Sequence, residues 1–356
     1  MNYIGSKLSL LEFLEDSISK VVKNDDNHVF CDLFAGTGAV GAHFKKKGYK
    51  VIANDIQYYS YVLNRHYIGN HKEFRFKKLE SVLPELRSVD VKNKKEFVCE
   101  YLSNLKGNKG FVYKNYCQGG TKNKKIQRLY FSDENGMKCD VIRQQLERWR
   151  NKKIINENEY FFLLTSLIES IDKCANTASV YGAFLKKLKK TAQKTMLLKP
   201  APFFINDHEH QVYNEDINTL TKKIKGDIVY LDPPYNQRQY ASNYHVLETI
   251  AKYDNPELKG KTGLREYSKQ KSLYCSKNEV KKSFKDLILN IKAKYIFLSY
   301  NNEGLMTPQE VRDIMGLRGK YGCFKKEYNR FKADKDKNRD YSANKTVEYL
   351  HYVCCE

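Results

Sequence analysis

Residues 29–55 decide the fold, and they read VFCDLFAGTGAVGAHFKKKGYKVIAND. Residues 29–34 form a short apolar run, which is typical of a buried strand and ends in a glycine-rich turn. Residues 40–47 then have the period of a short helix, and the apolar run 50–53 leads to Asp55. This order of strand, glycine turn, helix and strand predicts an α/β fold with a parallel sheet.

The turn carries a ligand-binding pattern. Gly36, Gly38 and Gly41 satisfy G-x-G-x-x-G, and Asp55 follows at the tip of the second strand. Glycines let the backbone approach a ligand closely, and a carboxylate at that tip can accept hydrogen bonds from both hydroxyls of a ribose. The pattern fits a nicotinamide dinucleotide and S-adenosylmethionine equally well, and a tight turn without a ligand is the structural alternative.

Asp32 favours one of these two cofactors. It lies four residues before Gly36, where its negative charge would repel the pyrophosphate of a dinucleotide. S-adenosylmethionine has cationic sulfonium and ammonium groups and no phosphate, so it suits this position. An NAD-dependent oxidoreductase is therefore the less favoured interpretation. An N-cap of the following helix is the alternative role of Asp32.

A second motif, Asp232-Pro233-Pro234-Tyr235, follows the apolar run 228–231. The two prolines stiffen the turn and hold its carboxylate and its ring in a fixed relation. Prolines have no N–H donor, so the carbonyls near Asp232 and Pro233 can serve as acceptors. Two acceptors beside an aromatic face suit a planar group with an exocyclic amine. A proline turn with a solvated carboxylate is the alternative.

Together, these motifs resemble those of the D12 class of DNA adenine-N6 methyltransferases, which have the alpha order of motifs and are Dam-like. The resemblance rests on NYIGSK at 2–7, DLFAGTG at 32–38, ND at 54–55 and DPPY at 232–235, in that order. It implies a Rossmann-like, S-adenosylmethionine-dependent methyltransferase sheet with an inserted basic target recognition region.

The resemblance also implies a division of the chain and a substrate. Residues 1–70 and 200–356 would form the catalytic domain, and residues 71–199 would be the inserted, DNA-binding region. The activity implied is transfer of a methyl group to a flipped-out adenine in double-stranded DNA. The modification enzyme of a restriction-modification system is the expected setting, with a cognate restriction endonuclease as a further partner.

The resemblance assigns roles to single residues. Asp232 and the Pro233 carbonyl would accept hydrogen bonds from the two N6–H groups, and Tyr235 would stack on the flipped adenine. Tyr3, which stands where Dam-type enzymes have Trp, and Lys7 would line the methionine end of the cofactor. The cofactor-binding set is Tyr3, Lys7, Asp32, Phe34, Gly36, Gly38, Asp55 for the ribose, Asp216 for the adenine amine, and Asp232.

Charge independently indicates a polyanionic partner. The chain has 63 Lys and Arg against 42 Asp and Glu, a net charge of +21. Residues 71–130 are rich in Lys and Arg, are expected to be rich in loops, and should contact DNA phosphates together with the lysines of 186–194. The predicted DNA-binding residues are Arg238, Tyr240, Asn243, Lys186, Lys187, Lys189 and Lys190.

Other function classes are less favoured. An rRNA adenine-N6 or guanine-N2 methyltransferase is the nearest alternative, since Asp-Pro-Pro-Tyr suits it too, but the N-terminal segment and the insertion favour DNA. A binding module without catalytic activity is another. The nine cysteines are scattered without a C-x-x-C pair, so we expect reduced structural thiols and no metal site. No apolar run long enough to span a membrane and no signal peptide are evident, which predicts a soluble, cytoplasmic protein without membrane contact. The resemblance implies association with the nucleoid and action as a monomer or weak dimer.

Periodicity predicts the remaining elements. Helices are expected at 8–22, 141–149, 159–171, 243–252 and 279–292, strands at 203–206, 227–231, 294–300 and 347–353, and a charged loop at 325–345.

Overall fold

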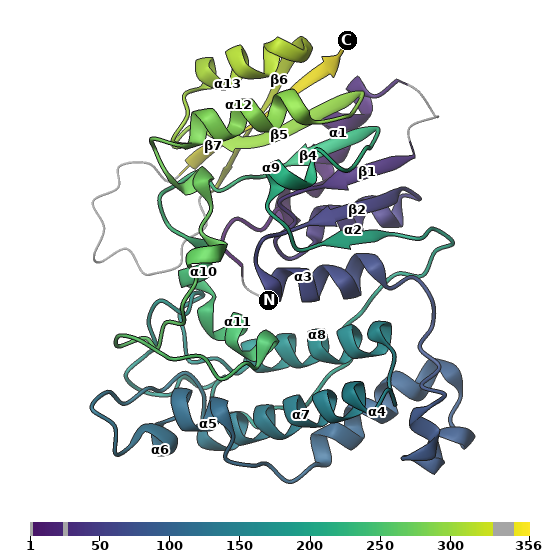
Figure 1. Cartoon of the computed structure of the whole chain (residues 1–356), viewed down its shortest axis with the longest axis vertical. Helices are drawn as coiled ribbons and strands as arrows, with labels where there is room; N and C mark the ends of the chain where they lie inside the picture. Colours follow the sequence, from purple (N-terminus) through teal and green to yellow (C-terminus); the bar gives the residue numbers. More distant parts are fainter. Residues whose placement is uncertain (1–2, 24–27, 330–344) are drawn as a thin grey trace. The chain divides into compact units, whose positions relative to one another are not determined.

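The computed structural model describes residues 3–23, 28–329 and 345–356 (Figure 1). The chain divides into two compact units. The sheet unit comprises Ile4–Asn64, Asn206–Tyr240 and Ser268–Glu356. The helical unit comprises Tyr3 with Arg65–Ile205 and Ala241–Tyr267.

The sheet unit is built on a seven-stranded sheet with the order β3-β2-β1-β4-β5-β7-β6. The pairs among β1 to β5 are parallel, whereas β7 runs antiparallel to both of its neighbours. The predicted α/β fold with a parallel sheet is therefore confirmed. The strands are β1 Val29–Asp32, β2 Lys50–Asn54, β3 Gln211–Tyr213, β4 Ile228–Leu231, β5 Tyr295–Asn301, β6 Gly319–Asn329 and β7 Lys345–Cys355.

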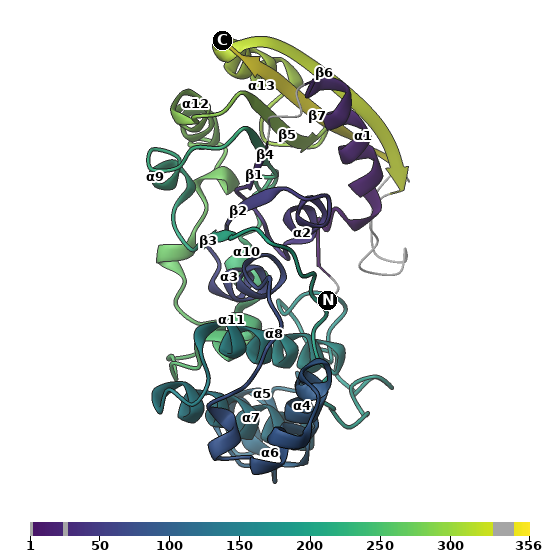
Figure 2. The ribbon, with the colours of Figure 1, turned by 90° about the vertical axis from the view of Figure 1, so that its right-hand side faces the viewer.

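Alternation along the strands gives the sheet two apolar faces. Ile228 and Tyr230 of β4 pack on one face, and Val229 and Leu231 on the other. Helices α1 (Leu11–Val21) and α2 (Ala39–Lys46) cover the first face, while α9 (Ile217–Leu220), α12 (Val280–Asn290) and α13 (Pro308–Met315) cover the second (Figure 2). The sheet unit is thus a three-layer α/β/α sandwich.

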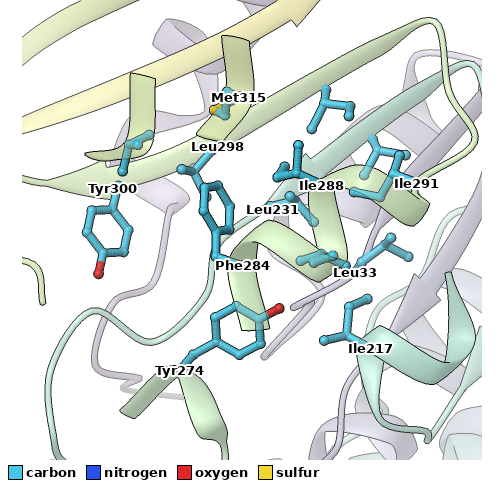
Figure 3. Close-up of a cluster of buried hydrophobic side chains, with 14 of the residues drawn as sticks. Leu33, Ile217, Leu231, Tyr274, Phe284, Ile288, Ile291, Leu298, Tyr300 and Met315 are labelled. Carbon is cyan, nitrogen blue, oxygen red and sulfur yellow. The ribbon is translucent and has the colours of Figure 1, made fainter. Parts of the chain in front are cut away.

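The second face holds the larger cluster of buried side chains. Phe284 and Ile288 of α12 meet Leu231 and Leu298 from the sheet, and Met315 adds a contribution from α13 (Figure 3). All of these side chains are almost fully buried. Burial on this scale makes α12 a principal support of the strands β4 and β5.

The strand order reverses between β1 and β4. From β1 the chain proceeds outward to β2 and β3, and from β4 it proceeds the other way to β5. Phe30 to Asp32 pair in parallel register with Ile228 to Tyr230. The segments that follow Asp32 and Leu231 therefore begin at neighbouring strand ends, which is where open parallel sheets bind their ligands.

The helical unit is centred on α8, Glu157–Lys173, most of whose residues are buried. A capping box between Asn156 and Glu159 starts this helix, and Ser132 caps the preceding helix α7. The other helices of the chain are α3 Tyr58–Asn64, α4 Lys94–Asn104, α5 Phe111–Tyr116, α6 Gln118–Thr121, α7 Asp133–Asn151, α10 Tyr240–Asn243, α11 His245–Lys252 and the π-helical η2 Arg65–Gly69. The 3-10 turns are η1 Leu8–Leu10, η3 Leu79–Ser81, η4 Pro84–Ser88, η5 Val91–Asn93, η6 Ser268–Gln270, η7 Leu273–Cys275 and η8 Gly316–Arg318.

Buried arginines tie Ala241–Tyr267 into the helical unit. Arg143 of α7 donates to the carbonyls of Ile250 and Ala251, each at 2.9 Å. These carbonyls lie at the end of α11, where a helix has no intrahelical donors left. Arg128 donates in the same way to the carbonyls of Lys261 and Gly260. The unit therefore differs from the predicted region 71–199, because it also contains a segment that we expected in the catalytic domain.

Some sequence predictions are wrong. Residues 203–206 are not a strand, and β3 at Gln211–Tyr213 forms that edge of the sheet instead. Residues 71–130 combine the predicted loops with helices that we did not predict, since α4 and α5 bury apolar positions that are too irregularly spaced to show a clear period. The expected loop at 325–345 is strand β6 as far as Asn329, and its residues 330–344 lie outside the described residues. The other predicted helices and strands are confirmed, with shifted ends.

All nine cysteines are free thiols, and six of them are buried. Within the described part of the chain, no helix combines the length and the apolar character needed to cross a membrane.

The packing of α12 generates a stability prediction. Phe284→Ala should lower the free energy of unfolding by about 3 to 5 kcal/mol, because it leaves a cavity in the cluster of Figure 3. Leu289→Ala, on the exposed side of the same helix, should change it by less than about 0.5 kcal/mol. Urea unfolding followed by circular dichroism measures both values. Similar losses in the two variants would contradict the described packing of α12.

Candidate functional site

The glycine turn after β1 is held from two sides. Gly36 and Gly38 adopt left-handed φ values of +52° and +79°, which glycine tolerates best. The N–H of Gly36 donates to Asp55 Oδ2 at 2.8 Å, and its carbonyl accepts from Asn64 Nδ2 at 3.0 Å. Gly38 is the N-cap of α2. The turn is therefore rigid before any ligand arrives.

Asp32 lies beneath this turn and is 1% exposed. Its carboxylate accepts the N–H of Gly41 in the first turn of α2 at 2.9 Å. Asp32 therefore caps the N-terminus of α2, although Gly38 is the N-cap residue. This contact is similar to the N-cap role that the sequence offered as an alternative. Burial raises the pKa of Asp32 to about 7, against the opposing effect of the Gly41 hydrogen bond, and the charges of Asp232 and Asp55 add to the increase.

Asn54 and Asp55 connect the ends of β1, β2 and β3. The buried Asn54 amide donates to the carbonyls of Leu33 and Glu215 and accepts the Glu215 N–H at 3.0 Å. Asp55 accepts from Gly36 and, at 2.8 Å, from the N–H of Gln57. These bonds direct the Asp55 carboxylate toward the glycine turn, as a ribose-binding carboxylate requires.

Asp232 follows β4 and forms an ion pair with Lys7. The Lys7 ammonium lies 3.1 Å from Asp232 Oδ1, and the two side chains are 6% and 19% exposed. Burial raises the pKa of Asp232 to about 6, Lys7 opposes this shift, and Glu348 adds to it. Burial opposes the charged form of Lys7, but Asp232 and Glu348 outweigh it and raise the pKa of Lys7 well above its usual value. A pKa of about 6 leaves the Asp232 carboxylate mostly ionised at neutral pH.

Glu348 completes this ion cluster and was not predicted. It lies on β7, is 1% exposed, and its Oε1 is 2.9 Å from the Lys7 ammonium. One feature of the sequence could have indicated it. Glu348 lies two residues before Leu350, so in a strand both side chains point to the same face of the sheet, and Leu350 is buried. Further buried polar groups lie on β4 and β5, where the Tyr230 hydroxyl donates to Ser299 Oγ at 2.8 Å.

The loop that follows Asp-Pro-Pro-Tyr is fixed by its neighbours. Pro233 is buried and Tyr235 half-buried, and the Tyr235 carbonyl accepts the Leu305 N–H at 3.1 Å. The Gln239 amide pairs with both the N–H and the carbonyl of Ser272. Tyr240 donates its hydroxyl to the Ile4 carbonyl at 3.3 Å, so this predicted DNA-binding side chain contacts the N-terminal segment.

The sheet unit brings together most of the predicted cofactor and catalytic residues. Phe34 packs edge-on against Tyr274, with ring centroids 5.0 Å apart. Asp216 is exposed and caps α9 by accepting the Thr219 N–H, which is a structural role. Arg238 is exposed on the loop after Tyr235.

The helical unit contains the remaining predicted residues. Tyr3 stacks on Tyr244 with ring centroids 4.7 Å apart. The carbonyl of Asn243 accepts the N–H of Tyr181. Lys189 donates to the Thr177 carbonyl at 2.8 Å. The side chains of Lys186, Lys187 and Lys190 are exposed.

The donor set of the sheet unit suits a cation better than a phosphate. The carboxylates of Asp32, Asp55, Asp232 and Glu348 gather at the carboxyl ends of the strands, and Lys7 offsets only part of their charge. In the ranges that the structure describes, no group of three or more His, Cys, Asp or Glu side chains is placed to hold a metal ion.

The strand order, with β7 reversed between β5 and β6, is that of the Rossmann-like methyltransferases, and the chain is of that class. The chain matches the model of the D12 class of N6 adenine-specific DNA methyltransferases over residues 3–314. It belongs to this family, and it is a DNA adenine-N6 methyltransferase. The predicted family and enzyme class are confirmed.

Curated relatives extend the comparison. The chain is 53% identical to the Type II methyltransferase M.NlaIII of Neisseria lactamica, over 99% of both chains. It is 36% identical to the Type II methyltransferase M.CviAII of Paramecium bursaria Chlorella virus 1, over 100% of this chain and 99% of that one. Its identity to the Type II methyltransferase M.FokI of Planomicrobium okeanokoites is 41%, and there it spans 52% of the relative's length.

The buried carboxylate of Asp32 generates a prediction about pH. The pKa of Asp32 is about 7 in the folded protein and ordinary, near 3.8, in the unfolded chain, so the folded form binds the proton more tightly. This group's contribution to stability is therefore present at low pH and lost as pH rises through about 7. Asp32→Asn can still accept from Gly41 and should gain stability relative to the wild type between pH 5 and pH 8.

Urea unfolding of both proteins without ligand, at these two pH values, measures the difference. The matched control is Asp207→Asn, at an exposed site of the same unit, which should show no such trend. A stability difference between Asp32→Asn and the wild type that is the same at both pH values would contradict the prediction.

Proposed function

We propose that this methyltransferase uses S-adenosylmethionine to methylate one adenine within a specific sequence of double-stranded DNA. The observation that carries the proposal is the ion pair of Asp232 with Lys7. The Asp232 carboxylate follows β4, and the Lys7 ammonium lies 3.1 Å from its Oδ1. An anionic, fixed acceptor is what the amine of a flipped adenine requires.

The residues around the glycine turn fit the cofactor. Asp55 faces the turn and would accept the ribose hydroxyls, while the backbone at Gly36 and Gly38 allows close approach. Phe34 and Asp32 would border the site, and the surplus of carboxylates favours a cationic ligand. When bound, S-adenosylmethionine supplies a methyl group on a positively charged sulfur. Lys7 and Tyr3 toward its methionine end, and Asp216 toward its adenine, stay predictions.

Asp232, Pro233 and Tyr235 would activate the target amine. The Asp232 carboxylate and the Pro233 carbonyl would accept hydrogen bonds from the two N6–H groups and draw the nitrogen toward tetrahedral geometry, which concentrates its lone pair. The nitrogen would then take the methyl group that S-adenosylmethionine supplies, and the N6 proton released by the transfer would pass to the Asp232 carboxylate and on to solvent. Tyr235 stacks on the extruded base, whose unstacking costs a few kcal/mol. The rigid loop keeps the acceptors in place during transfer.

The relatives indicate the biological setting. They are named Type II methyltransferases, and we propose that this chain likewise protects DNA within a restriction-modification system. A cognate endonuclease acting on the same site, and action as a monomer or weak dimer on DNA in the cytoplasm, belong to this proposal. The inserted region 71–199 would serve as the target recognition region.

Nucleoside mass spectrometry tests the substrate. The enzyme is incubated with labelled S-adenosylmethionine and either unmethylated genomic DNA or ribosomal RNA. We expect N6-methyladenine in DNA alone, clustered at one recognition sequence. Label in RNA alone would replace the DNA proposal by the rRNA alternative, and label in neither would favour a binding module.

Asp232→Ala tests the catalytic assignment. Lys7 would still be paired with Glu348, so we expect the variant to fold. Methyl transfer should fall by at least about 100-fold because the amine loses its charged acceptor. The affinity for S-adenosylmethionine, measured by calorimetry, should remain within a few-fold. Near-normal transfer by this variant would disprove the role of Asp232.

The exposed lysines of the helical unit generate a prediction about DNA affinity. Lys186, Lys187 and Lys190 should each contribute about 0.9 to the slope of log affinity against log salt if each contacts one phosphate. Replacing all three with Ala should therefore flatten the slope by about 1 to 3. Fluorescence anisotropy with a DNA duplex at several salt concentrations measures it.

The control removes the same charge from a different surface. Lys281, Lys282 and Lys285 are exposed on α12, and their triple Ala variant should leave the slope nearly unchanged. An unaltered slope in the first variant would exclude phosphate contacts at Lys186, Lys187 and Lys190.

A further inference from the structure

Glu348 is a buried carboxylate that the proposed chemistry does not use. It is 1% exposed, and it lies 2.9 Å from the ammonium of Lys7, which in turn lies 3.1 Å from Asp232. Two carboxylates thus share one lysine at the end of β4. Since burying an uncompensated charge is costly, a second carboxylate beside Asp232 needs an explanation.

The topology of the sheet places Glu348 there. β7 runs antiparallel to β5 and pairs Glu348 with Asn301 at the carboxyl end of β5. The beginning of β7 therefore returns to the edge of the sheet where β4 ends and Asp232 begins. Lys7 reaches the same edge from the N-terminal segment, which the Tyr240 hydroxyl holds at Ile4.

Lys7 lies within ion-pair distance of two carboxylates, Asp232 and Glu348. An ammonium paired with Asp232 alone would be free to move between the two oxygens of that carboxylate and compete with the substrate amine. The contact with Glu348 restrains the ammonium on one side, where it meets Oδ1 of Asp232. The second oxygen of Asp232 can then accept a hydrogen bond from the N6–H group.

We propose that Glu348 is a positioning residue, which holds Lys7 against Oδ1 of Asp232 so that the Asp232 carboxylate stays available to the target amine. The inference rests on the proposed role of Asp232. Glu348 itself touches neither the adenine nor the methyl group in this account, and acts through Lys7.

The surrounding charges predict the direction of a pH effect. The groups that act on Asp232 or are acted on by it are Lys7 from the N-terminal segment, Glu348 from β7, Tyr230 from β4 and Asp32 at the end of β1. Burial and Glu348 raise the pKa of Asp232 to about 6, and Lys7 opposes them. Removing the charge of Glu348 should therefore lower the pKa of Asp232.

Glu348→Gln in the full chain tests the proposal. Wild-type kcat should fall below about pH 6, as Asp232 is protonated. In the variant this acid limb should move to lower pH, while kcat at pH 7.5 falls by about 10-fold to 100-fold because the acceptor is misplaced. KM for DNA and for S-adenosylmethionine should stay within about 2-fold, since neither ligand contacts Glu348. A merely structural role would lower the folded fraction without moving the limb.

Controls separate this inference from the proposed function. Glu327→Gln removes the same charge from an exposed site on β6 and should retain the wild-type kcat and acid limb. If Glu348→Gln does not fold, Glu348→Asp keeps the charge but shortens the side chain, and it should lower kcat with little shift of the limb.

The outcomes are distinct. Wild-type kcat and an unmoved acid limb in Glu348→Gln, or wild-type kcat in Glu348→Asp, would overturn the inference while an inactive Asp232→Ala still supports the proposed function. An active Asp232→Ala would instead remove the proposed function, whatever Glu348→Gln does.

Discussion

The parallel pairing of β1 with β4 is the constraint on which the rest of the site depends. These strands lie at the point where the sheet order reverses, so their carboxyl ends meet with no other strand between them. One end leads into the glycine turn and the other into Asp-Pro-Pro-Tyr. The glycine turn and the Asp232 carboxylate are thereby placed at neighbouring strand ends, although about 200 residues separate them in the chain.

Electrostatics then distinguishes the carboxylates that gather at this edge. Asp55 is held by backbone N–H groups and faces the glycine turn. Asp32 is buried and caps α2, and its raised pKa reflects the cost of burying a charge without a cation. Asp232 is only partly buried, and Lys7 opposes the rise in its pKa that burial causes. The same residue type therefore has three different environments at this edge: backbone donors for Asp55, a helix terminus for Asp32 and an ammonium for Asp232.

The helical unit shows how distant segments become one body. Arg143 and Arg128 are buried, and both use their several donors on backbone carbonyls of Ala241–Tyr267. A guanidinium suits this task because its donors are fixed in a plane and can satisfy several acceptors at once. The charge that makes the chain strongly basic is thus not all available to DNA, as Lys189 also shows by donating to Thr177.

The sequence by itself determined the motifs, the order of strands and helices around them, and the family. Residues 29–55 and Asp232 to Tyr235 are local patterns, in which glycine, proline and apolar alternation dictate backbone geometry over a few residues. Their periodicity was enough to place β1, β2, β4 and β5. It was not enough for β3, because a three-residue edge strand has too few residues to show alternation.

Only the tertiary structure decided which polar side chains share one environment. Glu348 is a charged residue in a C-terminal strand until β7 pairs with β5 and brings it beside Lys7. Tyr3 and Asp216 are predicted cofactor-binding residues, yet Tyr3 stacks on Tyr244 and Asp216 caps a helix. Such outcomes depend on burial and on pairing between residues far apart in the chain, and no local pattern contains that information.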